Sequence, residues 1–176
     1  IRTIDLYRTD MTTPEQPGEF VFVVNGERIF VKGTNWVPLD AFHSRDAEHL
    51  PEVFNMLVDL NCNMVRCWGG NVYEDHAFFD LCDRNGIMVW QDFALACCLY
   101  PQTDTFADKI RREAEAVVAK LRNHPSLAIW AGNNEIDEAY QWSGYGLDPN
   151  DDRLSRQVLP KVVQKLDPFR PYLPSS

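Results

Sequence analysis

The sequence predicts an α/β fold, specifically a partial (β/α)8 TIM barrel, from two observations. Apolar runs typical of strands buried on both faces alternate with amphipathic helical segments, and this alternation calls for a parallel sheet covered by helices. Strand starts recur every ~25–40 residues, the size of one βα unit in an eight-stranded barrel of ~250 residues. The 176 residues therefore hold about four units and the start of a fifth, roughly half a barrel.

A complete doubly wound sheet is the structural alternative. Such a sheet would favour a glycine-rich phosphate loop after its first strand. Neither GxGxxG nor the GxxxxGK phosphate motif occurs in the sequence, and Gly69-Gly70 has no third glycine in register. The pattern therefore favours the barrel.

Residues 1–19 are expected to lie outside the barrel. They are polar and turn-rich, and the two prolines and the glycine within 14–18 are typical of a linker. Ile1–Leu6 alternates apolar and polar side chains, which predicts a strand left over from a preceding domain. The barrel segment is therefore expected to span residues 20–176.

The barrel segment begins with a predicted β-hairpin. Asn25-Gly26 separates the apolar runs 20–24 and 29–31, and this dipeptide between β-branched and aromatic runs is the strongest short-range hairpin signal. The second run continues into 33–36 and is expected to form the first barrel strand.

The rest of the chain alternates between buried strands and amphipathic helices. Further strands are predicted at 64–67, 87–90 and 127–131, and a last one from 170 onward. Helices are predicted over 46–60, over 77–82 between Glu74-Asp75 and Gly86, over 106–121 with a cap at Thr103 or Asp104, and over 154–166, where Pro160 must break the helix or begin a new one.

The composition is that of an ordinary globular protein, and the charge narrows the class of partner. Apolar residues make up 45% and charged residues 24%, and no apolar run approaches the ~18 residues of a membrane span. Seventeen basic residues against twenty-six acidic ones give a net charge of −9. This charge disfavours nucleic acids and anionic membranes as partners and suits a neutral substrate.

The cysteines and histidines predict neither a disulfide framework nor a metal site. The five cysteines are an odd number, Cys97 and Cys98 are adjacent, and no CxxC occurs. The four histidines are scattered and lack a zinc-binding spacing such as HExxH. Most of the cysteines are therefore expected to be small buried apolar residues.

Polar and aromatic side chains gather where the predicted strands end. In a parallel barrel this carboxyl edge carries the function. The residues concerned are Trp36 and Asp40 after the first strand, Arg66 and Trp68 at the second, Trp90 and Asp92 at the third, and Asn134 and Glu135 after the fourth. Flat apolar rings suit the C–H faces of a sugar, and amides and carboxylates suit its hydroxyls. The set predicts a carbohydrate substrate.

Glu135 is the strongest candidate for a catalytic residue. A carboxyl just beyond a buried strand and beside an asparagine pair could donate a proton to a glycosidic oxygen. The alternative is an acid that starts a helix and is favoured there by the helix dipole.

The other candidates also have structural alternatives. Arg66 could form a buried ion pair across the barrel interior, and Asp92 could cap a loop. Each of three tryptophans could simply fill core volume: Trp36, Trp68 and Trp142. The convergence of these residues on one edge carries more weight than any one of them.

Four segments in this order resemble the catalytic barrel of glycoside hydrolase family 2, and within it the β-mannosidase branch. The segments are GTNWVPLD (33–40), NMVRCWGG (63–70), CDRNGIMVWQDF (82–93) and HPSLAIWAGNNE (124–135). The resemblance covers about residues 20–176, and Ile1–Thr9 resembles the exit from the immunoglobulin-like domain that precedes the barrel in that family. Two departures are Asn71, where a third glycine is usual, and the paired Cys97-Cys98.

The resemblance implies a retaining exo-glycosidase that needs no cofactor. Glu135 would be the acid/base, Asn134 would hydrogen-bond the sugar 2-hydroxyl, and Arg66 would orient the nucleophile. The family pattern places Trp36, Asp40 and Trp68 around the terminal sugar, and Trp142 with them. Asp92 is also predicted to bind substrate, from its position at the end of the third strand. Trp142 is the weaker correspondence, because the loop that follows Glu135 varies.

The resemblance also implies a missing residue. In this family the nucleophile is a second glutamate at the end of the seventh strand, whereas the last glutamate here is Glu138. We therefore expect the chain to be a fragment that is inactive alone, with the C-terminal half of the barrel as its partner. Unpaired sheet edges would otherwise favour self-association.

Two classes of function stay open on the sequence. The first is an exo-glycosidase, with β-mannoside favoured by WVPLD (36–40) and β-galactosidase, β-glucuronidase or exo-β-glucosaminidase activity as alternatives. The second is a non-catalytic carbohydrate-binding module, which the missing nucleophile favours and the Asn134-Glu135 pair disfavours.

Overall fold

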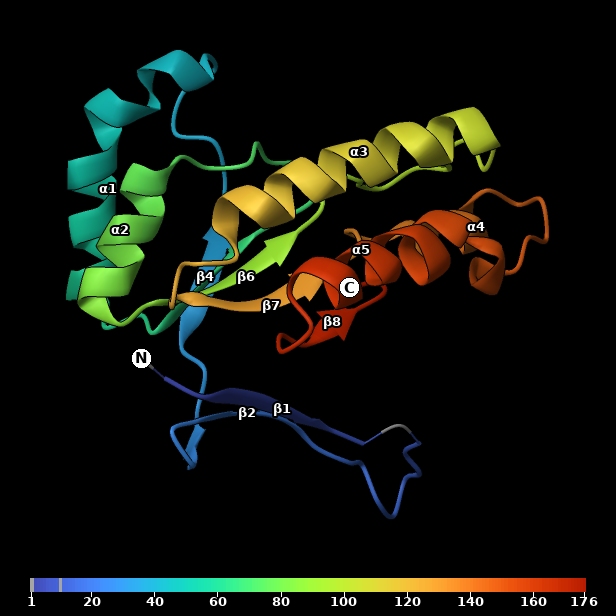
Figure 1. The fold of residues 1–176 in the computed structure, drawn as a ribbon. Helices are drawn as coiled ribbons and strands as arrows, with labels where there is room; N and C mark the ends of the chain where they lie inside the picture. Colours follow the sequence, from blue (N-terminus) through green and yellow to red (C-terminus); the bar gives the residue numbers. More distant parts are fainter. Residues whose placement is uncertain (1, 10) are drawn as a thin grey trace.

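The computed structural model describes residues 2–9 and 11–176, and its centre is a five-stranded parallel sheet (Figure 1). The strands are β4 (Gly33–Trp36), β5 (Met64–Cys67), β6 (Met88–Asp92), β7 (Leu127–Ala131) and β8 (Tyr172–Leu173). Each strand pairs in parallel with the next one along the chain, so the strand order never reverses. Because a doubly wound sheet requires a reversal, the sheet is that of a partial TIM barrel, as predicted.

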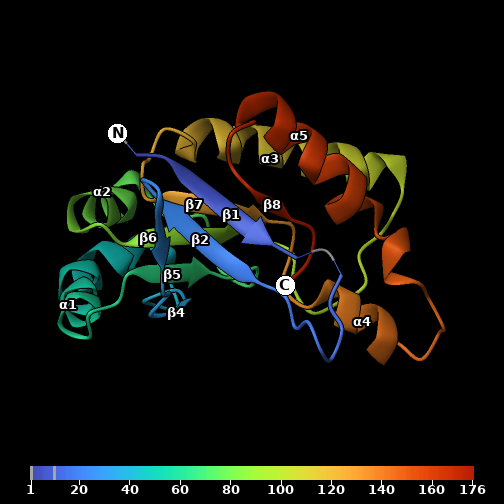
Figure 2. The same cartoon turned by 90° about the horizontal axis from the view of Figure 1, so that it is seen from below.

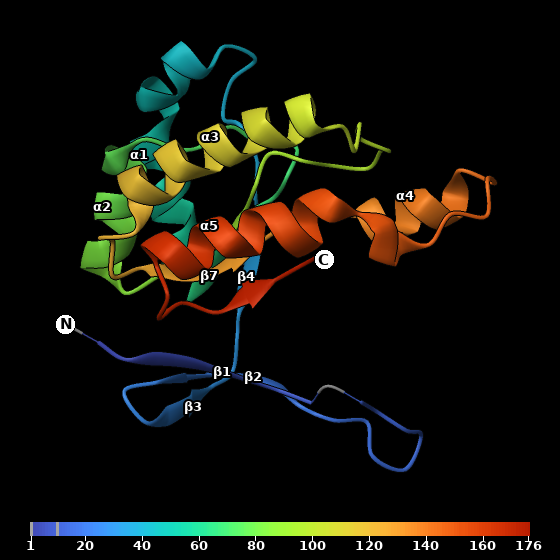
Figure 3. The same cartoon turned by 45° about the vertical axis from the view of Figure 1, so that its right-hand side comes forward.

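The helices connect the strands and lie together on one side of the sheet (Figures 1 and 3). They are α1 (Asp46–Asp59), α2 (His76–Asn85), α3 (Asp104–Leu121), α4 (Ile136–Trp142) and α5 (Leu159–Leu166). The predicted caps are present: the side chain of Thr103 accepts from the backbone N–H of Phe106, and Gly86 ends α2 in the left-handed conformation. Among the described residues, no helix is long and apolar enough to cross a membrane.

A small antiparallel sheet lies on the other side of the parallel sheet (Figure 2). It has the order β1 (Ile4–Arg8), β2 (Phe20–Val24), β3 (Glu27–Ile29), and Asn25 and Gly26 turn the predicted hairpin with positive φ angles. The run expected as the first barrel strand is divided: β3 ends the hairpin, and the barrel begins only at β4. Ile1 and Asp10 lie outside the described residues, and the domain boundary at residue 19 stays a prediction.

Two apolar clusters hold these layers together. The larger one fills the space between the parallel sheet and its helices, and its strand residues, such as Val65, Cys67 and Val89, project toward α1, α2 and α3. The smaller one joins Phe22 of the small sheet to Met64 and Met88, the first residues of β5 and β6. The small sheet therefore covers the barrel interior near the start of the strands and leaves the carboxyl ends open.

The last helical segment changes character at Pro160, as expected. A π-helical turn, Leu154–Val158, precedes α5, and Pro160 lies in the first turn of α5. Proline has no N–H to donate to the carbonyl four residues earlier, so the regular helix cannot continue through it and restarts there.

Asp83 joins the end of α2 to the loop that leads into β7. Its carboxylate accepts from the backbone N–H of Ser126 at 2.8 Å and bonds the His124 ring at 2.7 Å. The other ring nitrogen of His124 contacts His76 at 2.8 Å, so one buried imidazole connects both ends of α2 to the loop before β7. Burial alone would raise the pKa of Asp83, but these hydrogen bonds hold it below the ordinary value.

We expect Asp83→Ala to lower the free energy of unfolding at pH 7 by about 1–3 kcal/mol, because it leaves two buried donors without their acceptor. The pKa of Asp83 is lower in the folded chain than the ordinary 3.8, so this contribution is present above pH 3.8 and is lost as the pH falls through the folded-state pKa. Urea unfolding at pH 7 and at pH 3 measures the difference. Asp59→Ala, at the exposed end of α1, is the matched control. An equal deficit at both pH values would contradict this prediction.

Candidate active site

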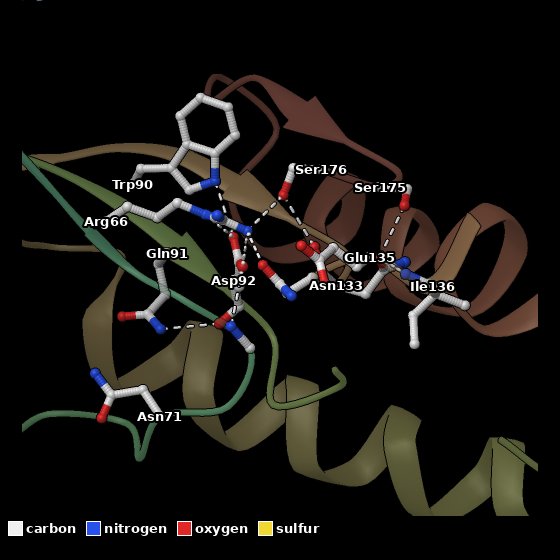
Figure 4. A network of polar contacts seen from close by, with 12 residues as sticks. Arg66, Asn71, Trp90, Gln91, Asp92, Asn133, Glu135, Ile136, Ser175 and Ser176 are labelled. Carbon is white, nitrogen blue, oxygen red and sulfur yellow. Dashed lines mark hydrogen bonds and ion pairs between the residues drawn. The ribbon is translucent and has the colours of Figure 1, made fainter. Parts of the chain in front are cut away.

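The loops at the carboxyl ends of the parallel strands bring together side chains that are far apart in the sequence (Figure 4). Arg66 comes from β5, Asp92 from the last position of β6, and Asn134 from the loop after β7. Ser176 follows β8 and joins the same cluster. The sequence prediction that the polar residues of these strands meet at one edge of the sheet is therefore confirmed for Arg66, Asp92 and Asn134.

Arg66 is the centre of this cluster. Its guanidinium makes a two-pronged ion pair with Asp92, with 2.7 Å between Nη2 and Oδ2 and 3.4 Å between Nε and Oδ1. Nη2 also donates to Oδ1 of Asn134 and to Oγ of Ser176, both at 2.9 Å. The guanidinium also lies over the indole ring of Trp90, with 5.9 Å between Cζ of Arg66 and the ring centre. The alternative interpretation of Arg66, a buried ion pair inside the barrel, therefore describes its main contact.

Asp92 is buried, which does not support the prediction that it binds sugar. Its side chain is fully buried, and its oxygens also accept from Nε1 of Trp90 at 2.9 Å and from the backbone N–H of Gly69 at 3.0 Å. Burial raises the pKa of Asp92 to about 6, although the bonds from Arg66, Trp90 and Gly69 oppose this shift. Its role in the structure is to hold Arg66 and to cap the loop that begins at Gly69.

Asn134 is held on both edges of its amide. Oδ1 accepts from Arg66, and Nδ2 donates to Sγ of Cys97 at 3.2 Å. The backbone of Asn134 is also fixed, because its N–H donates to Leu95 at 2.9 Å and it forms a parallel bridge with Ala96. The loop after β6 therefore extends the sheet past its named strands and fixes the orientation of the Asn134 side chain.

Glu135 follows Asn134 and stands at the start of α4. Its side chain makes no hydrogen bond to the backbone of that helix, so the alternative interpretation as a helix cap does not describe the carboxylate. Instead, Oε2 accepts from the thiol of Cys97 at 3.3 Å. The residue is half-buried, it has a left-handed φ of 57°, and its N–H donates to the carbonyl of Ser176 at 2.7 Å.

Asn133 supports this turn from below and was not among the predicted site residues. It is completely buried, and its amide makes four hydrogen bonds. Oδ1 accepts from the N–H of Ile136 and from Ser175, and Nδ2 donates to Ser155 and to a backbone carbonyl of the segment after β8. Asn133 thus caps α4 in place of Glu135 (Figure 4). The Glu135 carboxylate is therefore not needed for capping the helix. In the sequence, the one feature that could have pointed to Asn133 as a site residue was its position between Gly132 and Asn134.

Gly69 is required where the loops after β5 and β6 meet the turn before α4. A Cβ at this position would collide with the carbonyl oxygen of Leu95 and lie 3.1 Å from the backbone nitrogen of Asn134. The close approach of these three backbone segments allows the N–H of Gly69 to reach Asp92.

Trp36 lies away from the cluster, contrary to the prediction that it contacts sugar. In the parallel register Asn35 pairs with Arg66 and Trp36 with Cys67, so Trp36 projects toward the helices. Its ring is 3% exposed, packs 4.8 Å from that of Phe78, and donates its N–H to Glu74. Trp36 fills core volume, which was the alternative interpretation.

The remaining predicted residues lie around the edge of the sheet. Trp68 is half-buried and its ring covers Gly70. Asp40 lies in the loop between β4 and α1, where it accepts from the backbone of Phe42 and faces His49. Trp142 ends α4 and is 63% exposed. Contact of these three residues with a sugar stays a prediction.

Among the described residues, two groups of side chains have the composition of a metal site. They are His43, Asp46 and Glu74 near the start of α1, and Asp80, Asp83 and His124 beside α2. In the first group the Asp46 oxygens accept from the backbone N–H of Asp40 and bond His43, and Glu74 accepts from Trp36. The second group contains the Asp83–His124 contact described above. These contacts explain why the side chains of each group lie close together: their hydrogen bonds anchor the loops before α1 and before β7.

Comparison with known proteins agrees with this geometry. Residues 18–172 match the family described as "Glycosyl hydrolases family 2, TIM barrel domain". The chain is 38% identical to a β-mannosidase of Capra hircus over 99% of its own length, and 41% identical to a β-mannosidase B of Thermothelomyces thermophilus over 92%. It spans 21% of each of these relatives, about a fifth of their length.

Solved structures share the fold. A β-D-mannosidase from Dictyoglomus thermophilum superposes with a TM-score of 0.90 at 38% identity, over 99% of this chain and 22% of that one. An exo-chitosanase from Amycolatopsis orientalis gives a TM-score of 0.76 at 19% identity, over 99% of this chain and 19% of that one. At that identity the second similarity concerns the fold alone.

We expect the NMR titration of the Asp92 carboxyl to have its midpoint near pH 6, and Arg66→Met to move it higher, because the guanidinium opposes the effect of burial. Trp90→Phe should move it in the same direction by less. The folded-state pKa of Asp92 lies above the ordinary 3.8. Its ionisation therefore lowers the free energy of unfolding as the pH rises from 3.8 to about 6. Arg45→Met, which affects only the pairs of Asp40 and Glu48, is the control. A midpoint that falls in Arg66→Met would refute the role of Arg66.

Proposed function

Because this chain belongs to glycoside hydrolase family 2 and forms part of its TIM-barrel domain, we propose that it carries the acid/base half of a retaining exo-β-glycosidase acting on terminal β-mannosides. The observation that supports this proposal best is the arrangement of Asn134 and Glu135. Both follow β7, Asn134 is held by Arg66 of β5, Glu135 is held by Cys97 of the loop after β6, and the Glu135 carboxylate is not used by its own helix.

Glu135 would supply the proton transfers of the reaction. In the first step its carboxylic acid protonates the glycosidic oxygen while a carboxylate nucleophile attacks the anomeric carbon, and the C–O bond to the leaving alcohol breaks. In the second step Glu135, now a carboxylate, removes a proton from water, which displaces the nucleophile from the same carbon. No metal or cofactor is needed for this chemistry.

Asn134 and Arg66 would have different roles beside the sugar. The Asn134 amide nitrogen has two hydrogens, and its contact with Cys97 uses one of them. The other can donate to the sugar 2-hydroxyl, which carries the configuration that defines mannose. Arg66, held by Asp92, would orient a nucleophile supplied by a later barrel strand.

Three further residues would complete the binding site of the terminal sugar. The exposed ring of Trp142 and the half-buried ring of Trp68 offer apolar faces, and Asp40 offers a carboxylate. The rest of the barrel would be the partner that closes the site, with self-association through the open sheet edges as the alternative for the chain alone.

Other family activities are the second candidate. The two relatives called β-mannosidase are 38% and 41% identical to this chain, whereas the exo-chitosanase and a β-glucuronidase from Bacteroides uniformis are each 19% identical. This difference favours mannoside over glucosaminide and glucuronide. A non-catalytic carbohydrate-binding role is disfavoured because a binding module has no need for a free carboxylate beside Asn134.

We expect a full-length protein that contains this chain to hydrolyse the β-mannoside fastest within a panel of nitrophenyl glycosides. Glu135→Ala should lower kcat/KM on that substrate about 10²–10⁴-fold through loss of general acid catalysis. The loss should be smaller with a dinitrophenyl leaving group, which departs without protonation, and azide should restore turnover. Glu138→Gln, an exposed glutamate on the same helix, is the matched control. Wild-type turnover by Glu135→Ala would refute the role of Glu135.

The chain alone is expected to release no nitrophenol from the β-mannoside above the uncatalysed rate. Retention requires two carboxyl groups ~5–5.5 Å apart, and the second carboxyl in the Arg66 cluster, Asp92, is buried and paired. A discontinuous assay on the purified chain at high concentration measures this. Activity that disappears in Glu135→Ala would show that the chain contains its own nucleophile.

A further inference from the structure

The thiol of Cys97 contacts the two side chains to which the proposed mechanism gives direct roles at the sugar. Its sulfur accepts from Nδ2 of Asn134 at 3.2 Å and donates to Oε2 of Glu135 at 3.3 Å. One atom therefore touches both side chains that were assigned to the reaction. Cys97 is exposed, while Cys67 and Cys82 are buried in the apolar core, so its surroundings differ from those of a packing residue.

The backbone holds this thiol in place. The N–H of Cys97 donates to the carbonyl of Asn134 at 2.9 Å, and Ala96 forms a parallel bridge with Asn134. Cys97 has a φ of 55° and Glu135 a φ of 57°, both left-handed values that are unfavourable for a residue with a side chain. Such strain persists only where surrounding contacts enforce it, and it is concentrated at functional sites.

We propose that Cys97 is a positioning residue for the acid/base: its thiol fixes the carboxyl of Glu135 and the amide of Asn134 in one arrangement. The proposal rests on the proposed function of Glu135. The hydrogen bond from Cys97 is what connects the Glu135 carboxyl to another side chain in the described structure. Without the thiol, the carboxyl can rotate about its side-chain bonds. The loss therefore affects the proton-transfer step more than substrate binding.

The first test measures the contact itself by thiol reactivity, and it does not depend on activity. Burial and the neighbouring Glu135 carboxylate raise the pKa of the Cys97 thiol. In a full-length protein with Cys98→Ala, Cys97 is the exposed thiol of this chain. Glu135→Gln should then increase the rate of its reaction with methyl methanethiosulfonate at pH 7.5 several-fold, because more thiolate forms. Glu138→Gln should leave the rate unchanged, and an unchanged rate in Glu135→Gln would overturn the proposal.

The second test measures the effect on catalysis. Cys97→Ala should lower kcat on the β-mannoside about tenfold with KM nearly unchanged, which corresponds to the loss of one hydrogen bond to a charged group. Cys97→Ser, which keeps a donor, should recover most of kcat, and Cys98→Ala should have wild-type activity. A Cys97→Ala enzyme with wild-type kcat would refute the positioning role.

Chemical modification of the wild-type enzyme tests the positioning role of Cys97 without a mutation. The Cys97 thiolate attacks the sulfenyl sulfur of the methanethiosulfonate, an S–S bond forms, and methanesulfinate leaves with the electron pair. The added S–CH3 group should displace the Glu135 carboxyl and inactivate the enzyme, and dithiothreitol should restore activity. Inactivation of Cys97→Ser at the wild-type rate would overturn the proposal. Full activity of Glu135→Gln would instead refute the proposed function, so the two failures are distinguishable.

Discussion

The ion pair between Arg66 and Asp92 is the contact on which the carboxyl edge of this sheet depends. A buried carboxylate is costly unless donors surround it, and Asp92 has Arg66, Trp90 and the backbone of Gly69. Once fixed, the guanidinium reaches Asn134 and Ser176. A single arginine therefore ties β5 and β6 to the segments that follow β7 and β8.

The loops around this pair behave as an extension of the sheet. Ala96 pairs with Asn134 beyond the named strands, and Asn133 satisfies all four of its amide hydrogen bonds in a fully buried position. A glycine at 69 lets three backbone segments meet. Under the proposed function this fixed arrangement would matter, because a proton donor must be within hydrogen-bond reach of the oxygen it protonates.

The sequence predicted the strands, most helices and the edge where polar residues meet, because these follow from periodicity and from the geometry of parallel sheets. The prediction of site residues failed where the role of a residue depends on which face of a strand its side chain occupies. Trp36 follows Asn35 by one residue, and the period of two puts its ring among the helices. The contact of Cys97 with Glu135 joins residues 38 positions apart, and no local pattern encodes it. Asp92 has the residue type of a ligand, and only its burial identifies it as the anchor of Arg66.

The contacts that hold Asn134 and Glu135 all come from within this chain. Arg66, Cys97 and Ser176 are supplied by β5 and by the segments after β6 and β8, and Asn133 caps α4 from the same turn. None of these contacts requires a residue from the opposite side of a closed barrel. The positions of the Asn134 and Glu135 side chains are therefore set within this part of the barrel. Under the proposed mechanism Arg66 has two tasks, because it holds Asn134 and would also orient the nucleophile. In the proposed retaining mechanism the same arginine would therefore link the side of the site that carries the proton donor to the nucleophile, with the two carboxyl groups ~5–5.5 Å apart.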